Sequence, residues 1–99
     1  MNQLNLNEQQ FKKAALVIRA IKHPLRQKIM QLIHLRKSMT VTDIYVKLKL
    51  EQSVVSQQLA ILRQTRFVTT ARQGKQIYYA VNYQRLESVL KTVRALTTA

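Results

Sequence analysis

Strong breakers of regular secondary structure are almost absent from this chain, and their scarcity limits what it can fold into. Pro24 and Gly74 are the only proline and the only glycine among its 99 residues. Long stretches without either residue favour helices. The hydrophobic share of 46% is typical of a folded protein, and a chain of this length has material for one hydrophobic core. We therefore expect residues 1–99 to form a single, mostly α-helical domain.

Apolar residues recur at helical spacing through the first two thirds of the chain and predict four helices. Asn7 suits the N-cap of the first helix, and Pro24 suits the first turn of the second. Thr40-Val41-Thr42-Asp43 has the form of a capping box that opens a short third helix. The fourth helix is expected from Glu51 to about Thr65. The residues expected on the buried faces of the second, third and fourth helices are Leu25, Ile29, Leu32, Ile33, Val41, Ile44, Leu48, Val55, Leu59 and Leu62.

The hydrophobic pattern changes near residue 67. Residues 67–72 and 75–81 are rich in β-branched and aromatic side chains, which favour strands, and they flank Gln73-Gly74. Glycine adopts the positive φ that a tight hairpin requires. With Gln73-Gly74 as a two-residue loop, Arg72 would pair with Lys75. This segment therefore predicts a β-hairpin.

A last helix is expected from about Tyr83, where apolar residues return to helical spacing. The predicted order is α-α-α-α-β-β-α, a mostly α fold with a small β-hairpin. A short helix, a turn and a polar-faced helix followed by a hairpin together describe a winged helix-turn-helix. The fourth helix would be its recognition helix and the hairpin its wing.

The net charge favours nucleic acid as a partner. Seventeen Lys and Arg residues against four Asp and Glu residues give +13 at pH 7, and residues 9–42 and 52–86 contain no acidic residue. Such a field concentrates polyanions at the surface and favours nucleic acid through counterion release. An anionic membrane or an acidic protein could exploit the same field.

Missing residue types exclude other classes of protein. The chain has no Cys, so it has no disulfide and no thiolate metal or redox site. Four carboxylates and two His residues provide no supported nucleophile–base pair, and we expect no enzyme. No apolar run approaches the roughly 20 residues that span a bilayer. We therefore expect a cytoplasmic protein without a membrane partner.

The outward side of the predicted recognition helix is polar and carries no acid after Glu51. Gln pairs with adenine through two hydrogen bonds, and Ser contacts bases or phosphates. An ordinary solvated helix face has a similar composition, and the basic wing tip is what favours DNA binding here. The expected contacts with double-stranded DNA are Gln52, Ser53, Ser56, Gln57, Gln58 and Arg63 on the recognition helix and Arg72, Gln73 and Lys75 on the wing.

Three segments resemble the ArsR/SmtB-type winged-helix repressors. IRAIKHPLRQKI (18–29) is similar to the family's entrance to the second helix, EQSVVSQQLAILRQTRFV (51–68) to its recognition helix, and ARQGKQIYYAV (71–81) to its wing. The resemblance covers about residues 11 to 96. It implies a transcriptional repressor that dimerises through its first and last helices.

The metal sites of this family have no counterpart in the chain. Thiol-type sensors carry Cys-x-Cys where this sequence has Thr40-Val41-Thr42, and neutral hydroxyls are poor ligands for soft metals. His23 is expected to cap the second helix and His34 to lie in its last turn, both without further ligands. We expect no metal and no cofactor, which leaves a small molecule, a partner protein or protein abundance as the signal. The positions of the last-helix ligands of other sensors hold Tyr83, Arg85, Leu96 and Ala99.

Two further departures concern the backbone. The family usually has Gly in the helix-turn-helix turn and just after the recognition helix, where this chain has Lys49 and Arg66. A left-handed conformation at either residue costs on the order of 1 kcal/mol relative to Gly. Two extra cations near the duplex and a tolerated strain are both consistent with these residues.

The first and last helices carry more apolar surface than one small core can cover. Large side chains that stay in water cost about 1.5–3 kcal/mol each relative to burial. A second copy that packs helix on helix across a two-fold axis would cover them. The expected homodimer contacts are Phe11, Leu16, Ile18, Leu86, Val89, Leu90 and Val93.

These observations predict a sequence-specific DNA-binding transcriptional regulator, a repressor that acts as a homodimer on a near-palindromic operator. Two alternatives stay open at this point. A winged helix can use the same surfaces to bind a protein, and a non-specific nucleic-acid binder would use the charge without reading bases. The ratio of operator affinity to random-duplex affinity distinguishes the three.

Overall fold

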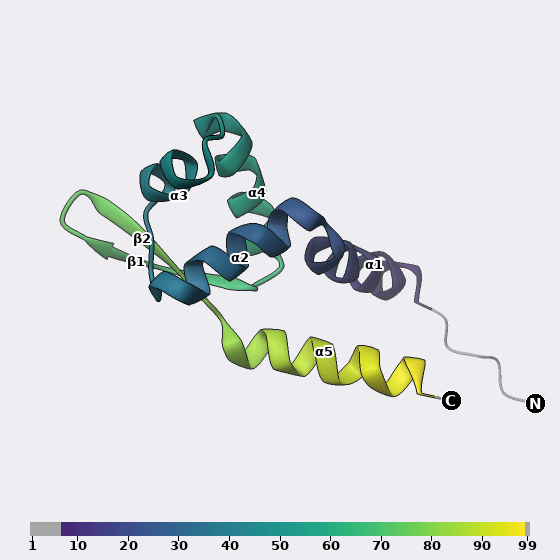
Figure 1. The fold of residues 1–99 in the computed structure, drawn as a ribbon. Coiled ribbons are helices and arrows are strands. Elements are labelled where there is room, and N and C mark those ends of the chain that lie inside the picture. Colours follow the sequence, from purple (N-terminus) through teal and green to yellow (C-terminus); the bar gives the residue numbers. More distant parts are fainter. Residues whose placement is uncertain (1–6, 99) are drawn as a thin grey trace, which may run out of the picture.

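The computed structural model describes residues 7–98. Along them, helices and one antiparallel hairpin follow in the order that the sequence predicts (Figure 1). The prediction of a mostly α fold with a small hairpin is therefore confirmed. The elements are α1 (Glu8–Lys22), α2 (Pro24–Arg36), α3 (Val41–Leu48), α4 (Gln52–Gln64), β1 (Val68–Gln73), β2 (Gln76–Val81) and α5 (Tyr83–Thr97).

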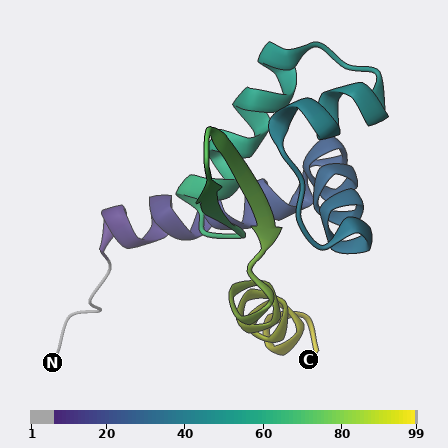
Figure 2. The same cartoon turned by 90° about the vertical axis from the view of Figure 1, so that its left-hand side faces the viewer.

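The helices are distributed over two ends of the molecule. In both views α3 and α4 lie at one end, α5 lies at the opposite end, and α2 and the hairpin pass between them (Figures 1 and 2). Met39, between α2 and α3, forms an antiparallel bridge with Tyr79 of β2. This bridge fixes the hairpin to the segment that leads into α3.

The hydrophobic core is formed mainly by α2, α3 and α4. All of its largest buried side chains except Phe67 lie on helix faces that the sequence predicts to be buried. Within the described chain, α1 contributes only Ala20 to the buried residues and α5 contributes none. The core therefore holds the helix-turn-helix together and leaves the first and last helices at its margin. The largest fully buried side chains are Phe67, Ile29, Ile33, Ile44, Leu59, Leu62 and Val55.

Side-chain caps begin the first three helices, as predicted. Asn7 Oδ1 accepts two backbone N–H groups of α1 at 3.0 and 3.3 Å. His23 Nδ1 accepts a backbone N–H of α2 at 3.2 Å. Thr40 and Asp43 form the reciprocal capping box of α3, with both hydrogen bonds at 3.1 Å. Each cap satisfies a backbone donor that the helix itself leaves free.

The register of the hairpin differs from the prediction. Its two-residue loop is Gly74-Lys75 rather than Gln73-Gly74, and Arg72 pairs with Ile77 rather than with Lys75. Gly74 has φ +62 and is the only loop residue with positive φ. That is the requirement of a type II′ turn, whose glycine stands at the first loop position. The shift moves each partner by two residues, so every side chain keeps its predicted face of the sheet.

Three non-glycine residues have positive φ among the described residues: Lys37, Lys49 and Arg66. Lys49 and Arg66 are the two positions where the family resemblance led us to consider a left-handed backbone, because glycine is usual there. Lys37 follows α2 with φ 73 and ψ −47, close to the strained γ-turn conformation near +75° and about −65°. The composition of the α2–α3 connection gives no signal for this strain, because Lys37 is not a residue type that favours positive φ.

We expect Lys37→Gly to stabilise the protein. Glycine removes backbone strain of about 1–3 kcal/mol and increases the entropy of the unfolded chain by roughly 0.5–1 kcal/mol, so the free energy of unfolding should rise by about 1 kcal/mol. Thermal unfolding followed by circular dichroism measures the change. Lys28→Gly is the matched control, since Lys28 is exposed inside α2, and there glycine should lower stability by about 1 kcal/mol. A lower melting temperature for Lys37→Gly would contradict the assigned strain.

Candidate nucleic-acid interface

The turn between α3 and α4 is made by three residues, Lys49, Leu50 and Glu51. Lys49 is left-handed, with φ 56 and ψ 45. The N–H groups of Lys49 and Leu50 donate to the carbonyls of Val46 and Tyr45 at 3.3 and 3.0 Å, which satisfies the end of α3 as a left-handed glycine does in many helices. Glu51 is the N-cap of α4 and makes no side-chain capping bond. The left-handed residue therefore redirects the chain from α3 into α4.

The recognition helix α4 has one buried and one exposed face. Val55, Leu59 and Leu62 are at most 1% exposed and hold the helix to the core. This packing fixes the rotation of α4 about its axis. It leaves five of the six predicted DNA-contacting residues of this helix in solvent, namely Gln52, Ser53, Ser56, Gln57 and Arg63.

Gln58, the sixth predicted contact on α4, is placed differently. It is half-buried, and its Oε1 accepts a hydrogen bond from Arg26 Nη1 of α2 at 2.7 Å. The amide oxygen of Gln58 therefore points toward α2. Sequence periodicity did not distinguish Gln58 from Gln57, because both residues are glutamine and the hydrogen-bond partner of Gln58, Arg26, lies 32 residues earlier in the chain.

The wing carries its predicted polar residues on the exposed tip. Arg72, Gln73 and Lys75 are all exposed. Arg72 Nε donates to the carbonyl of Gly74 at 3.3 Å, which draws the guanidinium toward the loop. The wing tip therefore presents two exposed cations, Arg72 and Lys75.

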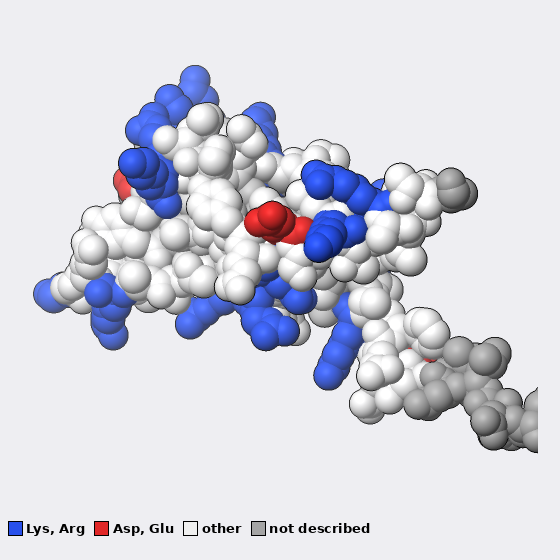
Figure 3. Space-filling model, turned by 90° about the horizontal axis from the view of Figure 1, so that it is seen from below, with Lys and Arg blue, Asp and Glu red and all other residues white. Residues whose placement is uncertain are grey.

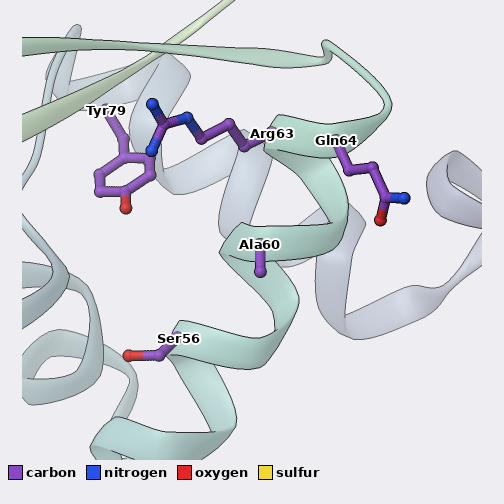
Figure 4. Close-up of a pocket in the computed structure, with 5 residues that line it drawn as sticks. All are labelled: Ser56, Ala60, Arg63, Gln64 and Tyr79. Carbon is purple, nitrogen blue, oxygen red and sulfur yellow. The ribbon is translucent and has the colours of Figure 1, made fainter.

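A surface cleft of about 470 Å³ separates α4 from the wing. Its lining contains two hydroxyls, a guanidinium and an amide, and no carboxylate (Figure 4). Tyr79 was not predicted as a site residue, since the sequence indicated only a strand here. The bridge to Met39, with hydrogen bonds of 3.0 and 2.8 Å, brings it opposite α4. The cleft is lined by Ser56, Ala60, Arg63, Gln64 and Tyr79.

The basic side chains of α4 and of the wing make no salt bridge within the described residues. Within residues 7–98, the salt bridge found is Lys12–Glu8 at 3.5 Å, on α1. No carboxylate therefore neutralises the cations of α4 or of the wing in this part of the chain. The space-filling view from below shows far more Lys and Arg than Asp and Glu surface (Figure 3). The excess charge identified in the sequence is thus distributed over exposed side chains.

The positions that correspond to metal ligands in other family members hold different chemistry here. The Thr40 hydroxyl is occupied by the capping box. His34 Nδ1 lies 2.7 Å from the hydroxyl of Tyr83, the first residue of α5, so these two side chains are hydrogen-bonded to each other. Residues 7–98 contain no group of three or more His, Cys, Asp or Glu side chains that could hold a metal ion. Ala99 lies outside the described residues.

The predicted dimer residues lie on helices that one chain leaves partly uncovered. Phe11 is 60% exposed and Ile18 is 43% exposed on α1. An apolar groove of about 570 Å³ runs between α1, α2 and α5. No helix of the described chain is long and apolar enough to cross a membrane. Leu16 is also exposed, whereas the α5 residues are half-buried, namely Leu86, Val89, Leu90 and Val93.

The fold and the exposed site define a winged helix-turn-helix protein. A sequence profile of the bacterial regulatory proteins of the arsR family matches residues 23–70. The transcriptional repressor PagR of Bacillus anthracis is 35% identical over 80 residues, which are 81% of this chain and 80% of PagR. The chain belongs to the ArsR family of regulatory proteins.

Solved structures agree with this assignment. The crystal structure of PagR superimposes with a TM-score of 0.68 at 33% identity and covers 88% of this chain and 99% of PagR. NolR of Sinorhizobium fredii gives 0.69 at 30% identity, with 96% and 94% of the two chains covered. An ArsR-like regulator from Rhodococcus gives 0.76 at 17% identity over 88% of this chain and 81% of its own, which shows the fold alone. The protein is therefore a DNA-binding transcriptional regulator and not an enzyme.

Proposed function

We propose that the protein is a repressor that binds a near-palindromic DNA operator as a homodimer. The observation that carries this proposal is the exposed, acid-free face of α4, which stands across a cleft from a basic wing. Two recognition helices related by a two-fold axis would enter successive major grooves, with half-sites about 10 bp apart. Repression would follow from blocking the promoter in the cytoplasm, and two relatives are named as repressors.

The exposed residues of α4 divide into two groups by their position. Gln52, Ser53 and Gln57 lie in the first half of the helix, which is the part that reaches base edges in a helix-turn-helix. Arg63 lies one residue before the end of α4 and shares the cleft with Tyr79. A phosphate backbone between α4 and the wing would meet these donors, while the wing tip would contact the neighbouring backbone or minor groove.

The homodimer is supported by the uncovered apolar surface of α1 and α5. The Cα radius of gyration is 15.9 Å, against about 13 Å for a compact domain of 100 residues. Half of the residues that line the groove between α1, α2 and α5 are aliphatic, and an equivalent helix of a second copy would cover them. They are Ile18, Ile21, Val81, Leu86, Leu90 and Val93. Repulsion between the two +13 chains is screened over about 10 Å at 0.1 M salt, and α5 runs away from α4 and from the tip of the wing (Figure 1).

We expect the polar residues of α4 and the basic residues of the wing to respond differently to Ala substitution. Gln52→Ala, Ser56→Ala or Gln57→Ala should reduce operator binding by about 1–3 kcal/mol for each lost base contact and leave random-sequence binding nearly unchanged. Arg72→Ala and Lys75→Ala should weaken binding to both DNAs and flatten its salt dependence. Fluorescence anisotropy measures both, with a duplex selected from a random library and a scrambled duplex. Equal losses on both duplexes for the α4 variants would refute base reading by that residue, and an unmutated protein that does not discriminate would refute operator binding.

The regulator should not respond to metals. Because His34 and Tyr83 bind each other and the chain has no Cys, low-micromolar Zn²⁺, Cd²⁺ or arsenite should leave its DNA complex intact. A gel-shift titration with each metal checks this. Release that a chelator reverses, and that disappears in Thr42→Ala or His34→Ala, would show a metal site after all.

Disrupting the α5 face should separate the dimer. Val93→Glu or Leu90→Glu would bury a carboxylate in an apolar contact, and we expect monomers that retain most of their helicity. Loss of the second DNA-binding unit should weaken operator binding by about 100-fold or more. Ala95→Glu is the control, since Ala95 is exposed and lies two residues along α5 from Val93, on the other side of the helix. Sedimentation of the unmutated protein as a monomer at micromolar concentration in 0.15 M salt would disprove the dimer.

A further inference from the structure

A buried cation lies beside the recognition helix. Arg26 in α2 is only 9% exposed, although a charged side chain that leaves water needs compensating partners. Arginine is the cation suited to such a place, because its planar guanidinium presents several donors in fixed directions. The partners of Arg26 therefore indicate which parts of the protein it holds together.

The guanidinium of Arg26 joins two helices that do not follow each other in the chain. Nε donates to the carbonyl of Ala20 at 2.9 Å, and a terminal nitrogen donates to the carbonyl of Arg19 at 3.1 Å. Both carbonyls lie in the last turn of α1, at the negative end of its dipole. The other terminal nitrogen donates to Gln58 Oε1 of α4 at 2.7 Å. None of the three acceptors is a carboxylate.

We propose that Arg26 and Gln58 form a strut that sets the orientation of α4 against the end of α1, and that both are positioning residues for DNA sequence recognition. The proposal rests on the proposed operator binding. It gives Gln58 a role inside the protein instead of the base contact that the sequence suggested. It also links α1, one of the two helices assigned to the dimer contact, to the helix that reads DNA.

The position of Gln58 explains why the strut would affect specificity more than affinity. Gln58 follows Gln57 directly, so the restraint acts at the part of α4 that faces DNA. Paired hydrogen bonds to a base edge require close alignment of the side chain, whereas phosphate contacts by flexible cations tolerate small displacements. A loosened α4 should therefore lose discrimination between sequences while it keeps most of its general affinity for DNA.

Two substitutions of Gln58 distinguish the strut from a direct base contact. Gln58→Glu keeps an acceptor for Arg26 and turns the hydrogen bond into an ion pair, whereas Gln58→Leu removes the acceptor. We expect the selected-to-scrambled affinity ratio to fall by about 3- to 30-fold in Gln58→Leu and to be largely preserved in Gln58→Glu. If Gln58 contacted a base, Gln58→Glu would not preserve the ratio, because a carboxylate does not reproduce the paired hydrogen bonds of the amide. It would also weaken binding to both duplexes, because the carboxylate would face the phosphates.

A double-variant cycle tests the bond itself. Arg26→Lys loses the guanidinium fork, so we expect the ratio to fall in this variant as well, and adding Gln58→Leu to it should cause little further loss. Melting temperatures are measured alongside, since a merely structural role would lower them without changing the ratio. If Arg26→Lys does not fold, the pair Gln58→Leu and Gln58→Glu still decides the question.

The outcomes separate the strut from the function on which it rests. An unchanged affinity ratio in folded Gln58→Leu, or a larger loss in Gln58→Glu than in Gln58→Leu, would overturn the strut. Failure of the unmutated protein to prefer its selected duplex would instead overturn operator binding. A loss in Gln58→Leu that Gln58→Glu restores would support the strut.

Discussion

The burial of one face of α4 is the interaction on which the other features depend. Val55, Leu59 and Leu62 pack among residues of α2, α3 and the segment before β1. Because a helix has only one rotation that buries three such side chains at once, this packing also decides which side chains remain in solvent. The polar face of α4, the cleft toward the wing and the place of Gln58 against α2 all follow from that single rotation.

The two ends of the molecule use opposite physical properties. At the end of α4 and the wing, exposed cations without a salt bridge in the described residues and neutral hydrogen-bonding groups face solvent. These groups suit DNA, whose phosphates are negative and whose base edges carry hydrogen-bond donors and acceptors. At the end of α5, aliphatic side chains line a groove that one chain does not fill. Arg26 donates hydrogen bonds to both α1 and α4. A helix proposed to form the dimer and the helix proposed to read DNA are therefore connected through one polar side chain.

The sequence allowed most of the fold and part of the site to be predicted. Helix faces, caps and the hairpin follow from local spacing, and Thr40 with Asp43 shows how a four-residue motif is enough to begin a helix. The exposed residues of α4 that are candidate DNA contacts could be predicted as exposed, because helical periodicity separates them from Leu59 and its neighbours. Tyr79 could not be predicted as a residue of the cleft, because its importance comes from the bridge to Met39, 40 residues earlier in the chain.

The sequence by itself determined the order of the elements, the apolar face of each helix, the absence of thiol chemistry and the surplus of positive charge. These properties depend on residue type and on neighbours within one or two turns. Tertiary structure decided the hairpin register, the strained backbone of Lys37 and the inward contact of Gln58. Each of these depends on backbone geometry or on groups that meet only after the chain has folded, and local spacing carries no information about such geometry.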